Sequence, residues 1–176
     1  MSDLKTASAS NPWAEAPSTA RLVLADGSVI VGSGLGATGS AVGEVCFNTA
    51  ITGYQEILTD PSYAGQIIVF TFPHIGNVGT NLEDTETSNL ASHSGVRGAV
   101  LRAGVTDPSN WRAGGHLDTW LKTRGIIAIA GVDTRALTAL IRETGMPNGV
   151  IAHEPSGNFD LDKLKAEAKA WPGLVG

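Results

Sequence analysis

The chain has 176 residues, of which 42% are hydrophobic and only 16% are charged, and its formal net charge is −5. This length and composition predict one globular domain with a sizeable core and exclude a disordered chain. The 12 Lys and Arg residues are scattered singly, so no nucleic-acid partner is expected. The apolar runs are too short to cross a bilayer, the N-terminus lacks a secretory signal, and no Cys/His spacing suits a metal. We therefore expect a cytoplasmic protein with no membrane partner and no metal site.

Strands dominate the first half of the chain. Residues 1–19 are rich in Ser, Ala, Thr and Pro, and we expect them to form a mobile extension ahead of a domain that spans 20–176. Asp26-Gly27 lies between two β-rich runs and indicates a hairpin. Strands are predicted at 21–25, 28–32, 44–49, 66–72 and 98–102.

Helices enter in the second half. They are predicted at 116–124, 134–144 and 161–171, with strands at 126–132 and 149–153. Asp133 and Asp160 stand where N-caps of two of these helices belong, and Gly145 stands where a C-terminal stop belongs. Strands first and helices later, without a repeat, predict an α/β domain of α+β-like or layered type.

The segment Gly34–Gly39 has the G-x-G-x-x-G spacing of a dinucleotide site. Such a site requires a helix to open at the third glycine, because the pyrophosphate binds at that helix N-terminus. The residues that follow are typical of a loop and then a strand, so we favour a loop that needs glycine. A nucleotide-binding protein that uses Gly34–Gly39 remains the alternative hypothesis.

No complete catalytic constellation is visible in the sequence. Cys46, the only thiol, alternates with Val45 and Phe47 in a predicted strand, which suggests a half-exposed packing residue without a neighbouring base. His74 lies in the polar loop 73–81, whose role the sequence leaves open. Ser62, in the turn Asp60-Pro61-Ser62-Tyr63, has no adjacent base and is expected to be a capping hydroxyl. The residues alone indicate a binding or assembly domain.

Three motifs carry a family resemblance. They are GATGSAVGEVCFNTAITGYQEILTDPSYAGQIIVFTFPHIGNVGTN at 36–81, IAGVDTRALTALIRETG at 129–145 and WPGLVG at 171–176. With them the chain closely resembles the N-terminal domain of the small, glutamine-hydrolysing subunit of carbamoyl phosphate synthase. Cys46 departs from the family, which usually has an aliphatic residue there.

The resemblance implies a layered β/β/α fold of the swivelling type. It also implies that a C-terminal class I glutamine amidotransferase domain, which carries the nucleophilic cysteine, is missing from this chain, so that the truncated chain alone is inactive. In the complete complex, ammonia from L-glutamine passes to a large subunit that binds ATP and Mg²⁺ and makes carbamoyl phosphate for arginine and pyrimidine synthesis. The expected partners are this large subunit and the missing domain. The low fraction of charged residues in the chain suits a domain whose surface is partly covered by partners.

Among the residues, the resemblance assigns only Ser62 to a site, as a group that hydrogen-bonds the substrate glutamine. No catalytic residue and no cofactor are expected in this chain. Besides the nucleotide-binding alternative, an independent interaction module unrelated to carbamoyl phosphate stays open.

Overall fold

A computed structural model describes residues 18–81, 95–107 and 115–174. Most of the predicted extension 1–19 therefore lies outside the described residues. The strands that the structure describes are β1 (Ala20–Leu24), β2 (Val29–Gly36), β3 (Gly39–Asn48), β4 (Gln66–Phe70), β5 (Gly98–Val100), β6 (Ile127–Ala130) and β7 (Asn148–His153). The described helices are α1 (Tyr54–Thr59), the 3₁₀ turn η1 (Pro61–Tyr63), α2 (Leu117–Thr123), α3 (Thr134–Thr144) and α4 (Leu161–Ala170).

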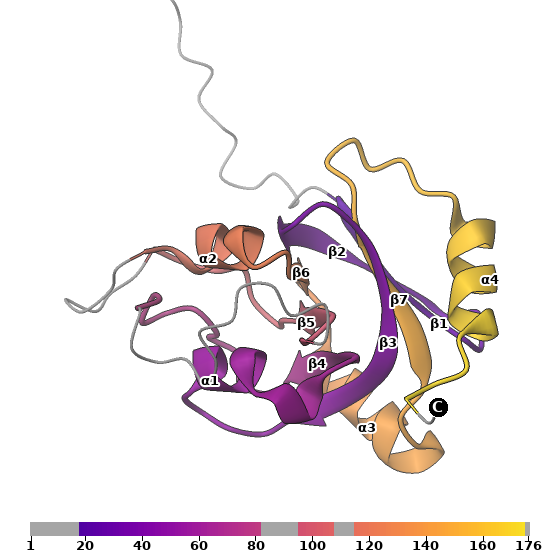
Figure 1. Cartoon of the computed structure of the whole chain (residues 1–176), viewed down its shortest axis with the longest axis horizontal. Coiled ribbons are helices and arrows are strands. Elements are labelled where there is room, and N and C mark those ends of the chain that lie inside the picture. The colour runs from indigo at the N-terminus through magenta and orange to yellow at the C-terminus, as the bar shows by residue number, and fades with distance from the viewer. Residues whose placement is uncertain (1–17, 82–94, 108–114, 175–176) are drawn as a thin grey trace, which may run out of the picture.

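The strands form one sheet that closes into a barrel in the order β1-β2-β6-β5-β4-β3-β7. The neighbours β3, β4, β5 and β6 run parallel, whereas β1, β2 and β7 join the sheet through antiparallel pairs. Parallel neighbours require crossover connections, and α1 and α2 lie in two of them. Figure 1 shows α1 and α2 on one side of the barrel and α4 on the opposite side. The mixed α/β class is thus confirmed.

Alternate side chains of the strands point into the barrel and form its core. The interior cluster includes Leu22, Val45, Ile67, Ile129 and Ile151, all of them fully buried. Helix α3 adds apolar side chains to this cluster from one end of the barrel. Burial of this interior is the main stabilising contribution to the fold.

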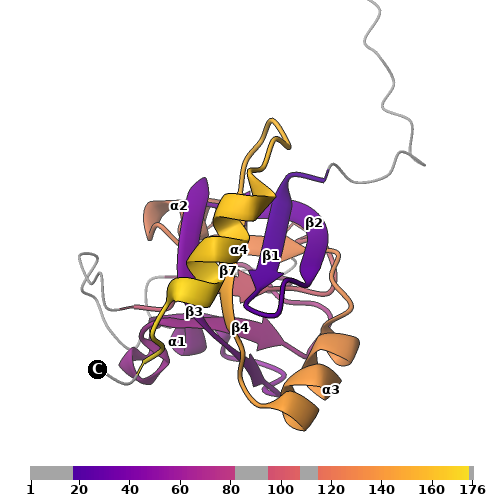
Figure 2. The ribbon, with the colours of Figure 1, turned by 90° about the vertical axis from the view of Figure 1, so that its right-hand side faces the viewer.

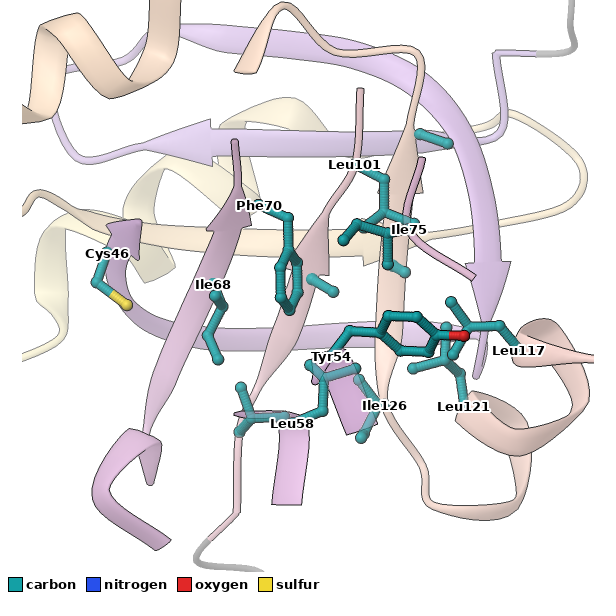
Figure 3. Packing of buried hydrophobic residues seen from close by; sticks show 14 residues of the cluster. Cys46, Tyr54, Leu58, Ile68, Phe70, Ile75, Leu101, Leu117, Leu121 and Ile126 are labelled. Atoms are coloured by element: carbon teal, nitrogen blue, oxygen red, sulfur yellow. The ribbon is translucent and has the colours of Figure 1, made fainter. Parts of the chain in front are cut away.

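Helices also cover much of the opposite face of the strands. Helix α2 packs mainly on β2 and β6, and together with α1 it covers the outer cluster that Figure 3 shows around Phe70, Tyr54 and Leu121. Helix α4 covers β1 and β7 with Leu164 and Ala168, as the turned view in Figure 2 makes clear. None of the described helices has the length and apolar character needed to cross a membrane.

Most predicted elements are confirmed. The hairpin around Asp26-Gly27 joins β1 to β2, and Asp133 and Asp160 cap α3 and α4 by accepting backbone N–H groups at 3.1 and 3.0 Å. Gly145 follows α3 at φ 87°, as a helix stop requires. Helix α1 was not predicted, because its six residues are too few for a periodic pattern and Gly53 before it offers no side-chain cap.

The interpretation of Gly34–Gly39 as a loop is partly wrong, since β2 continues to Gly36 and β3 begins at Gly39. The structure also contradicts the nucleotide-binding alternative, because a strand stands where a dinucleotide site needs a helix. The Gly36 N–H donates to the Asp118 carboxylate at 2.7 Å, which occupies the amide that a phosphate would use. A Cβ on Gly34 would overlap the imidazole of His153, so this glycine serves packing.

Replacement of Gly34 by alanine is expected to lower the free energy of unfolding by about 2 kcal/mol, because the added methyl group must displace the His153 ring. Gly104→Ala is the matched control, since a Cβ there meets no heavy atom within 4 Å. Urea unfolding of both variants measures the difference. Equal stability of the two variants would contradict the packing role of Gly34.

Candidate functional site

The turn that carries Ser62 stands on the surface between α1 and β4. Pro61 opens the 3₁₀ turn η1, and Asp60 caps it. Asp60 Oδ1 accepts hydrogen bonds from the Ser62 backbone N–H at 2.8 Å and from the Ser62 hydroxyl at 2.6 Å. These two hydrogen bonds lower the pKa of Asp60 below its usual value, and the bond from the hydroxyl has the larger effect. The Ser62 hydroxyl is exposed and oriented, and its free lone pairs can accept a hydrogen bond from a ligand N–H group.

The turn is attached to the end of β3. The Asn48 side chain donates from Nδ2 to the Tyr63 hydroxyl at 2.9 Å, and its Oδ1 accepts the Ala50 N–H at 2.8 Å. At the other end of the turn, the Gly65 N–H donates to the Gly95 carbonyl at 3.2 Å. These bonds hold the position of Ser62 relative to the barrel.

Helix α1 organises the loop 73–81. The Tyr54 hydroxyl donates to the Gly79 carbonyl. Gln55, which is only 3% exposed, pairs twice with the Asn81 backbone, donating from Nε2 to its carbonyl and accepting its N–H, both at 2.9 Å. A buried amide that is satisfied in this way fixes a loop in one conformation. Sequence reasoning missed this arrangement because it missed α1.

His74 lies on the same loop with an exposed ring. The ring meets Phe72 edge-to-face, with 6.0 Å between the ring centroids. This contact is structural and brings no second catalytic group to the imidazole. In the part of the chain that the structure describes, no three His, Cys, Asp or Glu side chains converge on a point that could hold a metal ion.

Cys46 is a packing residue, as predicted, but it is not half exposed. It is 6% exposed and belongs to the outer cluster, where Figure 3 places it beside Ile68. Both faces of β3 are covered at Cys46, so alternation along the strand does not bring this side chain to solvent. Burial, and next the negative charge of Glu44, raise the pKa of the Cys46 thiol to about 11. Because the thiolate is the nucleophilic form, this thiol is inert at neutral pH.

Comparison with known proteins identifies the family of the chain. Residues 22–151 match the family model described as carbamoyl-phosphate synthase small chain, CPSase domain. This match covers most of the chain, and the chain belongs to that family. The expected resemblance to the small subunit of carbamoyl phosphate synthase is confirmed.

Curated relatives agree with the family match. The carbamoyl phosphate synthase small chain of Mesorhizobium japonicum is 72% identical over 164 residues, which are 93% of this chain and 41% of the relative. That of Bradyrhizobium diazoefficiens is 69% identical with the same coverage, and that of Rhizobium meliloti is 65% identical. The chain therefore spans about two-fifths of the length of the curated relatives that it matches.

The buried thiol predicts a dependence of stability on pH. An unfolded thiol titrates near its ordinary pKa of 9.0, whereas folded Cys46 titrates near 11. Between these values the unfolded chain has lost the proton and the folded chain keeps it, so the contribution of Cys46 is complete below pH 9 and is lost as the pH rises to 11. The loss amounts to roughly 2–3 kcal/mol for a shift of this size.

Urea unfolding at several alkaline pH values, carried out on the chain and on Cys46→Val, isolates this contribution. All other titrating groups are common to the two proteins, so the stability difference should change across this range and be constant below it. A constant difference throughout would contradict the raised pKa.

Proposed function

We propose that this chain is the N-terminal structural and docking domain of the glutamine-hydrolysing small subunit of carbamoyl phosphate synthase. The observation that carries the proposal is the family match, together with sequence identities far above the level at which function commonly diverges. The complete small subunit would release ammonia from L-glutamine, and the large subunit would use it to make carbamoyl phosphate for arginine and pyrimidine synthesis in the cytoplasm.

We infer that the chain alone does not hydrolyse glutamine. Glutamine amidotransfer of this class needs a thiolate on an exposed turn and a base beside it, and Cys46 is buried with a raised pKa. The nucleophile would belong to the amidotransferase domain, and ATP and Mg²⁺ to the large subunit. The role of this chain would be to hold those two partners together.

Ser62 is the residue that we propose to touch glutamine. Its hydroxyl donates to Asp60, so it offers lone pairs to a ligand, and both the carboxamide and the ammonium group of glutamine carry N–H donors. One exposed hydroxyl cannot hold a small molecule without an enclosing pocket, which the amidotransferase domain would supply. We further propose that residues 20–176 form one layered unit of the swivelling type.

Size-exclusion chromatography of the chain mixed with the carbamoyl phosphate synthase large subunit of the same source tests the docking role. Co-elution is expected, because the docking surface would reside in these residues. If the chain elutes separately while the complete small subunit co-elutes, the essential contacts lie in the other domain. If neither co-elutes, the chain belongs to a different complex, as the interaction-module hypothesis holds.

In the complete enzyme, Ser62→Ala is expected to raise the KM for glutamine about three- to tenfold and to lower kcat less, which is the effect of losing one hydrogen bond to bound substrate. Ser28→Ala is the matched control. Ser28 is also exposed and two residues after an aspartate, and its N–H donates to Asp26 Oδ1 at 2.8 Å, as that of Ser62 does to Asp60. An unchanged KM for the Ser62 variant would contradict the assignment.

A further inference from the structure

A hollow of about 560 Å³ opens between α3 and the ends of three neighbouring strands. Three arginines line it: Arg102, Arg135 and Arg142. The hydroxyl-bearing residues Thr49 and Thr71 belong to the same lining. This volume is within the range of small-molecule sites in proteins.

The topology of the sheet explains why these residues meet. Strands β3, β4 and β5 are parallel, so their carboxyl ends lie at one edge of the sheet. Thr49 and Thr71 follow β3 and β4 directly, and Arg102 follows β5. Arg135 and Arg142 are seven residues apart on α3, which places them on one helix face about two turns apart. Crevices at the carboxyl ends of parallel strands are where α/β proteins commonly bind ligands.

The positive charge of the hollow is not neutralised by the rest of the described chain. None of the three arginines forms an ion pair or a hydrogen bond with another described residue. Glu143 is the one acidic residue in the lining, so the lining carries three positive charges and one negative charge. The whole chain has a net charge of −5, and this concentration of arginine is therefore local.

The donors of the hollow are arranged for an anion. The Arg142 guanidinium lies 5.2 Å from the centroid of the Phe47 ring, and this contact leaves its in-plane N–H groups available. Thr49 has a hydroxyl that is bonded to no other described residue. The Thr71 and Thr138 hydroxyls already donate to backbone carbonyls at 3.2 and 2.7 Å, so the arginines and Thr49 supply the free donors.

We propose that this hollow binds a small phosphate-bearing anion. Guanidinium groups form paired, charge-assisted hydrogen bonds with phosphate oxygens, and a hydroxyl adds a further donor. Ala139 is the one residue of the lining whose side chain carries no polar group, so donors and charges are spread around the whole hollow. The N-terminus of α3 takes no part, because Asp133 caps it. The proposal goes beyond the proposed function and rests only on residues of this chain.

Isothermal titration calorimetry of the chain with sodium pyrophosphate tests the site. We expect Arg135→Gln and Arg142→Gln each to weaken binding at least tenfold, and Arg135→Lys to weaken it less, because lysine keeps the charge but loses the paired donors. Lys169→Gln is the matched control: it removes the same charge from an exposed position on α4 and should change binding less than twofold. Arg102 and Arg135 are exposed and bonded to no other described residue, so the Tm of their variants without ligand should stay constant. Arg142→Gln also loses the contact with the Phe47 ring, so Arg102→Gln, which lies outside any helix, is the second test if an α3 variant unfolds.

Titrations with inorganic phosphate, pyrophosphate and a nucleoside triphosphate distinguish the sources of the anion. Binding of inorganic phosphate or pyrophosphate supports a site for a compact anion, and tighter binding of a nucleoside triphosphate supports a site for nucleotide phosphates. Failure of all three to bind would overturn the proposal. Binding of a polyglutamate peptide without binding of pyrophosphate would also overturn it, because the hollow would then receive an acidic protein segment. Equal weakening of pyrophosphate binding by Lys169→Gln and by the arginine variants would overturn it as well.

Discussion

Closure of the sheet by β7 is the constraint on which the other features depend. This strand pairs with β1 along one edge and with β3 along the other. A closed barrel of so few strands is narrow, so its interior accepts large side chains only where the facing position is small. A Cβ on Gly98 would lie 2.8 Å from Ile151 Cγ2, and one on Gly149 would lie 2.9 Å from Val45 Cγ2. The two glycines thus leave room for the branched side chains opposite them. A shift in the strand register would place a larger residue there and cause a steric clash.

The parallel pairing of β3, β4, β5 and β6 determines where the crossover connections lie. Each parallel pair needs a crossover outside the barrel, and the crossovers bury the outer face of the same strands. The crossover from β3 to β4 contains α1 and the turn of Ser62, whereas the carboxyl ends of the strands form one wall of the arginine-lined hollow. Asn48 links these two regions, because its side chain holds Tyr63 and its carbonyl accepts hydrogen bonds from Thr71. A shift in the end of β3 would therefore move both.

Local signals in the sequence predicted most elements, and long-range packing explains what they could not predict. The hairpin at Asp26-Gly27 and the caps Asp133 and Asp160 are local, and they were recognised from residue type and position. The interior and exterior of the barrel were not distinguishable, because continuous apolar strands lack alternation when both faces are buried. For the same reason the exposure of Cys46 was overestimated. Helix α1 has no local signal and exists because Tyr54 and Gln55 bond to a loop more than twenty residues away.

The site residues differ in what a sequence could reveal about them. Ser62 came from a resemblance, since nothing in the sequence of its own turn separates it from another turn serine such as Ser28. The hollow had no sequence signal, because its arginines lie on separate elements and converge only through the parallel order of β3, β4 and β5. These two features also differ physically. A single oriented hydroxyl gains affinity only when another surface encloses the ligand, whereas three guanidinium groups around one hollow can bind an anion without help. The role proposed for the Ser62 hydroxyl therefore depends on a partner of the chain, and the role proposed for the hollow does not.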